Sequence, residues 1–245
     1  MLFRSVATGC RPEQVLPFST GVIGEPLPVA RFEQGLPEAL SSLAADGWEA
    51  AARAIMTTDT VPKAFSRTLM HDEMRYTVTG IAKGAGMIRP DMATMLAFLA
   101  TDAPLTRAEA QAVLSAAVTP TLNRVTVDGD TSTNDACVLA ATGAAGAGPL
   151  PASFIDGPLR GVVTDVCEAL ARAIARDGEG ANRLVVVHVA GGRDDEECAR
   201  VAFTVAESPL VKTALYAADP NWGRILAAVG RSGVEGLDID RVGLA

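Results

Sequence analysis

The segment that carries most of the structural and chemical information in this chain is Lys83–Leu96, with the sequence KGAGMIRPDMATML. Its two glycines and its lysine are typical of a loop that binds phosphate. The segment matches neither GxxxxGK[ST] nor GxGxxG, so phosphate binding is weakly supported. A tight turn between two strands is the simplest structural interpretation. A third interpretation depends on the Ala93-Thr94 pair.

A threonine hydroxyl is a poor nucleophile unless a base removes its proton. The chain has only two histidines, His71 and His188, and His188 lies in an apolar run. Another available base is the α-amine of Thr94 itself, with a pKa of about 7.7–8.0 once the bond before it is cut. Attack on the Ala93 carbonyl would give an ester, and its hydrolysis would free Thr94. Ala-Thr pairs are common, so this interpretation needs further support.

Composition excludes several classes of protein. The chain has 245 residues, 49% of them hydrophobic and 4% aromatic, which predicts a folded core built mainly from Ala, Val and Leu. The net charge of -8, without a cluster of Lys or Arg, argues against nucleic acid and anionic membranes as partners. No apolar run approaches the ~18 residues of a membrane span, and Met1–Glu13 lacks a signal segment.

Cysteine and histidine spacing predicts neither disulfides nor a metal site. The cysteines form no CxxC pair, and no histidine stands near one in metal-ligand spacing. We expect free thiols in a reducing cytoplasm. The acidic run Asp128–Asp135 does not match an EF-hand loop, so we interpret it as a turn whose polar side chains bond their own backbone. The four cysteines are Cys10, Cys137, Cys167 and Cys198.

Hydrophobic periodicity predicts alternating helices and strands, and therefore an α/β or α+β fold. Thr106 with Glu109 forms a capping box that opens one of the helices. Thr94–Leu99 is too short to classify. Helices are predicted at Pro37–Ala44, Trp48–Ile55, Thr106–Val118, Arg160–Arg176, Asp194–Ala206, Ser208–Ala217 and Asn221–Val229. Strands are predicted at Val15–Phe18, Arg75–Ile81, Asn123–Val127, Leu184–Val189 and Leu237–Val242. Both ends of the chain fall close to a predicted strand, so we expect a fold that is incomplete at both ends.

Seven segments together resemble one known family. Lys83–Leu96 resembles the self-cleavage motif of the ornithine acetyltransferases, also called glutamate N-acetyltransferases, and six further segments match in family order. They are STGVIG (19–24), MTTDT (56–60), VDGDTSTND (127–135), DGEGA (177–181), SPLVKTA (208–214) and DPNWGRI (219–225). The resemblance implies an α/β fold of stacked mixed sheets flanked by helices, in an N-terminal-nucleophile-like αββα arrangement. It also implies cleavage between Ala93 and Thr94, giving chains 1–93 and 94–245 that fold as one catalytic unit and assemble as a heterotetramer.

The resemblance further implies a cytoplasmic acetyltransferase of arginine biosynthesis. The acetyl group of N2-acetyl-L-ornithine would move to L-glutamate by a ping-pong mechanism, through an ester on the nucleophile. No metal or cofactor is implied, although acetyl-CoA is a possible second donor. Carried over to this sequence, the nucleophile is Thr94, the oxyanion is stabilised by Thr20 and Gly21, and the substrate is bound by Thr57, Lys83, Thr94 and Glu179.

Two other functions remain open at this point. An amidohydrolase or aminopeptidase would use the same nucleophile, with water in place of glutamate. A truncated scaffold without catalysis is the other, because family members extend beyond both ends of this chain and carry a substrate-binding Asn and Thr in the missing tail. Without the resemblance, Lys83 and Glu179 would be interpreted as solvated surface residues.

Overall fold

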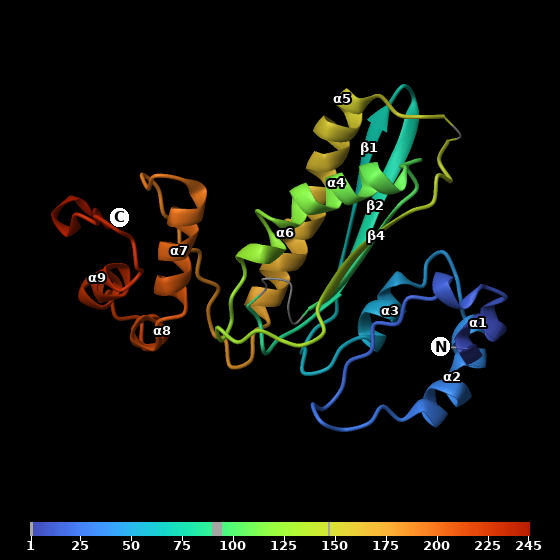
Figure 1. Ribbon diagram of the computed structural model, residues 1–245, viewed down its shortest axis with the longest axis horizontal. Helices are drawn as coiled ribbons and strands as arrows, with labels where there is room; N and C mark the ends of the chain where they lie inside the picture. Colours follow the sequence, from blue (N-terminus) through green and yellow to red (C-terminus); the bar gives the residue numbers. More distant parts are fainter. Residues whose placement is uncertain (1, 90–94, 147) are drawn as a thin grey trace.

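The computed structural model describes residues 2–89, 95–146 and 148–245 (Figure 1). Ala93 and Thr94, and therefore the predicted cleavage site and nucleophile, lie outside the described residues. A central sheet with two long helices separates an N-terminal group of helices from a C-terminal group (Figure 1). The two termini consequently lie at opposite ends of the molecule.

One four-stranded sheet forms the centre of the described structure, in the order β1-β2-β3-β4. Strand β2 pairs antiparallel with both β1 and β3, whereas β3 and β4 are parallel. The register places Lys83 opposite Leu96, and Leu96 opposite Ala136, so the end of β2 adjoins the beginnings of β3 and β4. The strands are β1 (Lys63–His71), β2 (Met74–Lys83), β3 (Leu96–Thr101) and β4 (Ala136–Ala141).

Helices α4 (Arg107–Val118) and α6 (Arg160–Arg176) pack against this sheet and against each other. The buried residues of α6 recur at helical spacing, from Val163 to Ile174, as an amphipathic helix requires. Gly80 in β2 permits the close approach, because a Cβ there would lie 2.9 Å from Val166 Cγ1. The sequence thus fixes α6 over the part of β2 that leads to Lys83.

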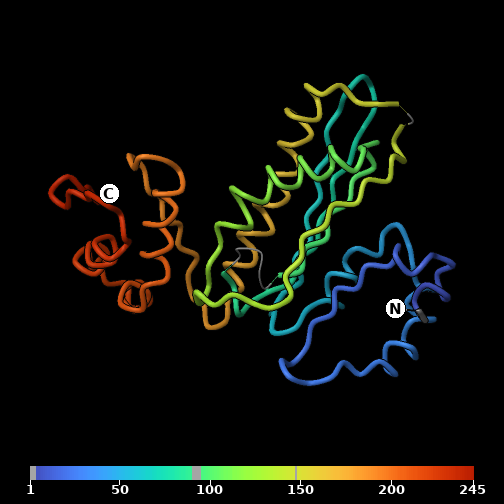
Figure 2. The backbone as a smooth tube through the Cα atoms, viewed as in Figure 1, coloured from blue at the N-terminus to red at the C-terminus, as the bar shows by residue number. Residues whose placement is uncertain are grey.

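The remaining helices cover the two ends of the molecule (Figure 2). The C-terminal group has a small core of its own, which includes Val201, Val211 and Val229. No helix within the described ranges is long and apolar enough to cross a membrane. These helices are α1 (Leu2–Thr8), α2 (Val29–Ser41), α3 (Trp48–Ala54), α7 (Asp195–Ala206), α8 (Pro209–Tyr216) and α9 (Trp222–Gly230). The short α5 (Ala152–Phe154) instead lies in the central part and leads into α6 (Figure 1). Short 3-10 turns are η1 (Pro12–Gln14), η2 (Leu122–Arg124) and η4 (Ile239–Arg241), and η3 (Ile155–Leu159) is π-helical.

The predicted mixed α/β class is confirmed, with a mixed sheet flanked by helices. Helices with clear local signals occur where the sequence places them. The Thr106 hydroxyl accepts from the Glu109 amide at 3.3 Å, and the Glu109 carboxylate accepts from the Thr106 amide at 2.8 Å. Helix α6 ends at Arg176, directly before the predicted stop at Asp177.

Four strand predictions were wrong. Val15–Phe18 has no strand structure, Asn123–Val127 overlaps the end of η2, and Leu237–Val242 contains η4. Leu184–Val189, predicted as a strand buried on both faces, has no regular secondary structure, and Val186 is 69% exposed. β-branched residues favour an extended backbone, but a strand also requires a neighbour to hydrogen-bond with, and the described part of the chain offers none here.

Candidate functional site

An open cleft of about 640 Å³ lies at the end of the sheet where β2 finishes and β3 begins. It gathers residues from segments that are far apart in the sequence, including four of the predicted site residues. Met95, the residue after Thr94, also lines it. The lining residues are Ser19–Gly24, Leu27, Thr57, Thr58, Lys83, Gly86, Met87, Met95, Leu96 and Ser132–Asp135.

Lys83 and Thr57 form one wall of the cleft. Lys83 is the last residue of β2 and is only 8% exposed, so its ammonium is held at a fixed place. Its Nζ lies 3.5 Å from Thr57 Oγ1, which brings together two of the predicted substrate-binding side chains. A partly buried ammonium beside a hydroxyl can bind a carboxylate through charge-assisted hydrogen bonds.

Glu179 lies against the loop that follows Lys83. Its backbone N–H donates to the Ala85 carbonyl at 2.7 Å. A Cβ added to Gly86 would lie 2.5 Å from the carboxyl carbon of Glu179, so only glycine leaves room for this carboxylate. Because Gly86 lines the cleft, Glu179 lies next to the cleft, in the turn that follows α6. The site thus offers both a cation and an anion.

Thr20, which is half-buried, and Gly21, which is exposed, lie in a second segment that lines the cleft. The Asn134 Nδ2 group donates to the Ser19 carbonyl at 2.8 Å, immediately before Thr20. The Phe18 ring packs edge-on against Phe98 of β3, with ring centroids 5.3 Å apart. These contacts hold the predicted oxyanion residues beside the strand that begins directly after Met95.

The polar run Asp128–Asp135 supports the site. The Asp128 carboxylate accepts from the backbone amides of Met87 at 2.6 Å and Ile88 at 3.0 Å, as well as from Asp130 in its own turn at 3.0 Å. The predicted turn with side chain to backbone bonds is therefore confirmed. Through Asp128, the run also holds the loop after Lys83.

Asp135 is a site residue that sequence reasoning did not single out. Its carboxylate oxygens are buried and have no side-chain hydrogen-bond partner within the described structure. Burial raises the pKa of Asp135 to about 7, while the nearby Lys83 charge acts against this rise. Its position at the junction of a polar run and the apolar strand β4 was the signal available in the sequence.

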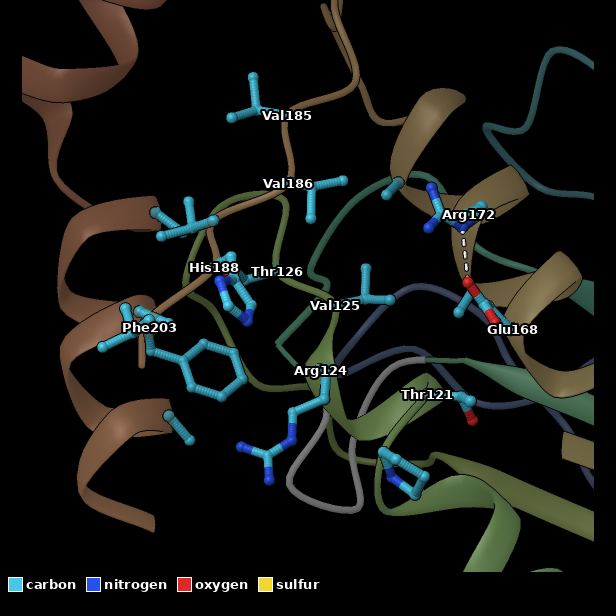
Figure 3. A pocket seen from close by; sticks show the side chains of 18 of the residues that line it. Thr121, Arg124, Val125, Thr126, Glu168, Arg172, Val185, Val186, His188 and Phe203 are labelled. Atoms are coloured by element: carbon cyan, nitrogen blue, oxygen red, sulfur yellow. Dashed lines mark hydrogen bonds and ion pairs between the residues drawn. The ribbon is translucent and has the colours of Figure 1, made fainter. Parts of the chain in front are cut away.

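A second hollow of about 420 Å³ lies between α6 and α7 (Figure 3). Arg124, His188 and Phe203 are among its lining residues, and Glu168 accepts from Arg172 at 2.9 Å on its α6 side. None of the predicted site residues lines it. Within the described ranges, no group of three His, Cys, Asp or Glu side chains could hold a metal ion. The cleft at the sheet end is therefore the candidate active site.

Comparison with known proteins identifies the family of the chain. The ArgJ family matches residues 3–245. The chain belongs to the ArgJ family. The resemblance inferred from the seven segments is thus confirmed, since they lie within one continuous family match.

Two curated ArgJ relatives are close in sequence. The arginine biosynthesis bifunctional protein ArgJ of Pseudomonas fluorescens (strain Pf0-1) is 54% identical over 237 residues, covering 96% of this chain and 58% of the relative. The protein of the same name from Pseudomonas syringae pv. tomato (strain ATCC BAA-871 / DC3000) gives the same identity and coverage. The chain therefore spans little more than half the length of these relatives.

A solved ArgJ structure supports the fold. The crystal structure of the arginine biosynthesis bifunctional protein ArgJ from Bacillus halodurans matches with a TM-score of 0.50 and 46% sequence identity. The match covers 55% of this chain and 63% of that chain. The mixed α/β architecture is thus shared with an ArgJ protein of known structure.

Proposed function

We propose that this ArgJ-family chain forms the acetyl-transfer site of a glutamate N-acetyltransferase in arginine biosynthesis. It would move the acetyl group of N2-acetyl-L-ornithine to L-glutamate. The observation that carries the proposal is the cleft, which gathers Thr20, Gly21, Thr57 and Lys83 around Met95, the residue bonded to Thr94.

The proposed nucleophile is Thr94, freed by cleavage after Ala93. Its new α-amine takes the proton of the hydroxyl as the oxygen attacks the acetyl carbonyl. The bond from the carbonyl carbon to the ornithine nitrogen then breaks, and that nitrogen receives the proton. In the second half, the glutamate amine attacks the ester, and the Thr94 oxygen leaves with a proton. The sequence is a ping-pong reaction.

Stabilisation of the oxyanion falls to Thr20 and Gly21. The Thr20 hydroxyl and the Gly21 amide would donate to the oxygen that becomes negative in each half-reaction. Loss of one such donor typically costs about 2.7–4 kcal/mol of barrier. The presence of these two residues in the lining of the same cleft as Lys83 supports this division of roles.

Recognition of the amino-acid part falls to Thr57, Lys83 and Glu179. Both substrates carry a carboxylate that suits the Lys83 ammonium, and ornithine has an ammonium that suits the Glu179 carboxylate. The proposal includes chains 1–93 and 94–245 acting as one unit, a heterotetrameric assembly in the cytoplasm, and acetyl-CoA as a possible second donor. It requires no metal or cofactor.

Transfer is tested by incubating the purified protein with acetyl-labelled acetylornithine and glutamate. We expect labelled acetylglutamate, and its loss in Thr94→Ala. Thr204→Ala, which removes a hydroxyl on the distant helix α7, should leave the yield unchanged. Release of labelled acetate with or without glutamate would show an amidohydrolase instead. A protein that yields neither product would contradict the proposal.

A further inference from the structure

A buried lysine lies behind the candidate site, in a position that sequence reasoning did not single out. Lys63 is the first residue of β1 and is 1% exposed. Its ammonium donates to the Asp59 carboxylate and to the Asp177 carboxylate, at 2.6 Å in both cases. These carboxylates have 0% and 6% of their side-chain surface exposed. The three side chains form a buried cluster, here called the Lys63 cluster.

Each carboxylate in the Lys63 cluster also accepts hydrogen bonds from the backbone. Asp59 accepts from the Gly84 amide at 2.7 Å and the Thr57 amide at 3.0 Å. Asp177 accepts from the amide and the hydroxyl of Thr60. Burial acts to raise the pKa of Asp59, but the Gly84 amide and Lys63 bring it below its usual value. Burial of Asp177 is likewise outweighed by hydrogen bonds from Lys63 and Thr60, which lower its pKa, so both carboxylates remain ionised and hold their hydrogen-bond donors in place.

These backbone bonds lead directly to the proposed substrate-binding residues. Asp59 holds the backbone of Thr57 and of Gly84, the residue after Lys83. Asp177 follows the end of α6 and stands two residues before Glu179. The Glu179 backbone amide donates a hydrogen bond to the Ala85 carbonyl, in the same loop as Gly84. The three segments that carry Thr57, Lys83 and Glu179 are therefore joined through one ammonium group.

A buried pair of charges is a poor device for stability alone, because desolvation offsets much of the attraction. The backbone amides that donate to Asp59 and Asp177 belong to the segments that carry Thr57 and Lys83, so the cluster can position these residues. We propose that Lys63 is a positioning residue, which fixes the separation of the Lys83 ammonium and the Glu179 carboxylate by holding Asp59 and Asp177 together. The site then selects acyl donors that carry both a carboxylate and an ammonium, as acetylornithine does. This inference rests on the proposed function.

The test compares two acyl donors in the same protein. Acetylornithine has the charged groups that Lys83 and Glu179 would bind, whereas p-nitrophenyl acetate has neither. Lys63→Met removes the ammonium and keeps much of the side-chain volume. We expect it to raise the KM for acetylornithine by about tenfold to a hundredfold, as a small misplacement can. The rate with p-nitrophenyl acetate should be unchanged.

Two control variants separate positioning from general loss of stability. Arg53→Met breaks the exposed pair with Glu49, which has the same four-residue spacing as Asp59 and Lys63, and should change neither rate. Leu170→Ala opens the core under the sheet without touching the cluster and should lower both rates together. If Lys63→Met lowers both rates together, or changes neither, the inference is overturned.

Amide hydrogen exchange provides a readout that does not depend on activity. In Lys63→Met we expect the Gly84 and Glu179 amides to exchange faster than in Arg53→Met. If the parent protein reacts with neither donor, the proposed function fails, and the exchange measurement alone tests the inference. Equal exchange rates in Lys63→Met and Arg53→Met would then overturn it. If Lys63→Met does not fold, Asp59→Asn serves in both tests, because its amide can accept at one oxygen only.

Discussion

The two walls of the cleft are supported in different ways. The substrate wall, with Thr57, Lys83 and Glu179, has its backbone hydrogen-bonded to the Lys63 cluster and to the loop after β2. The oxyanion wall, with Thr20 and Gly21, belongs to a segment in which residues 21–30 are all exposed. The contacts described for this segment are one hydrogen bond from the Asn134 side-chain amide to the Ser19 carbonyl, and one ring contact between Phe18 and Phe98.

This difference separates two properties of the site. Substrate recognition depends on buried hydrogen bonds that form with the core of the protein, so it should respond to changes in that core. Stabilisation of the oxyanion depends on a segment held by few contacts, so it can be changed with little effect on folding. Substitutions in the two walls should therefore act on KM and on kcat separately.

The largest effect is expected beneath the substrate wall. Leu170 is fully buried in α6, against β2 at Gly80. Leu170→Ala should lower the free energy of unfolding by about 2–5 kcal/mol, because it leaves a cavity in the core. Denaturant unfolding measures this loss, and Leu210→Ala at a 58% exposed position is its control. A loss no greater than that of the control would show that α6 does not support this wall.

Gly86→Ala should affect binding and leave folding almost intact. The new Cβ would meet the flexible end of Glu179 at 2.5 Å, which can move away without disturbing the backbone. We expect the KM for acetylornithine to rise about tenfold to a hundredfold, with kcat less affected. Gly161→Ala, in open space on α6, is the matched control. An unchanged KM would mean that Glu179 does not bind substrate from this position.

Asp135, which also lines the cleft, should give the protein a pH-dependent stability. Its raised pKa means that the folded protein binds a proton more tightly than the unfolded chain. Its contribution to stability is therefore present at acid pH and is lost as pH rises from about 4 to about 7. The neutral side chain in Asp135→Asn does not titrate, so the variant should not lose this stability. Its free energy of unfolding, relative to the parent, should therefore rise over that pH range by about 1–2 kcal/mol, a value reduced for the partial exposure of Asp135.

Denaturant unfolding at several pH values measures this difference. Asp156→Asn, at an exposed position on η3, is the control and should show no such trend. A parent protein whose stability relative to Asp135→Asn is constant between pH 4 and pH 7 would contradict the assignment.

The smallest effect is expected in the oxyanion wall. Asn134→Ala removes the hydrogen bond to the Ser19 carbonyl, which is worth about 0.5–1.5 kcal/mol. We expect kcat to fall with little change in KM or in the midpoint of unfolding. Asn123→Ala, outside the cleft, should leave kcat unchanged. A rise in KM with constant kcat would indicate that the two walls are not separate.

Local signals in the sequence predicted part of this architecture. The capping box at Thr106 and the apolar spacing of α6 are properties of neighbouring residues, so both helices could be predicted. Strand β4 was missed, and Leu184–Val189 was predicted wrongly, because strand formation depends on a partner distant in the sequence. Strand β1 was also missed, although it forms a hairpin with β2, the next strand along the chain.

The candidate site was predicted through its family resemblance rather than through periodicity. The cleft contains Thr20, Gly21, Thr57 and Lys83 together, and Glu179 adjoins it at Gly86. Lys63 could not be singled out, because lysines are rarely buried and its partner Asp177 is 114 residues away. Only the fold brings these charges together.

The mass of the protein after reaction with acetylornithine tests the central claim most directly. We predict two chains, 1–93 and 94–245, with one acetyl group on the second that disappears when glutamate is added. Thr94→Ala should remain a single chain without acetyl. An active protein that stays unbroken, or an acetyl group that persists in Thr94→Ala, would contradict the account.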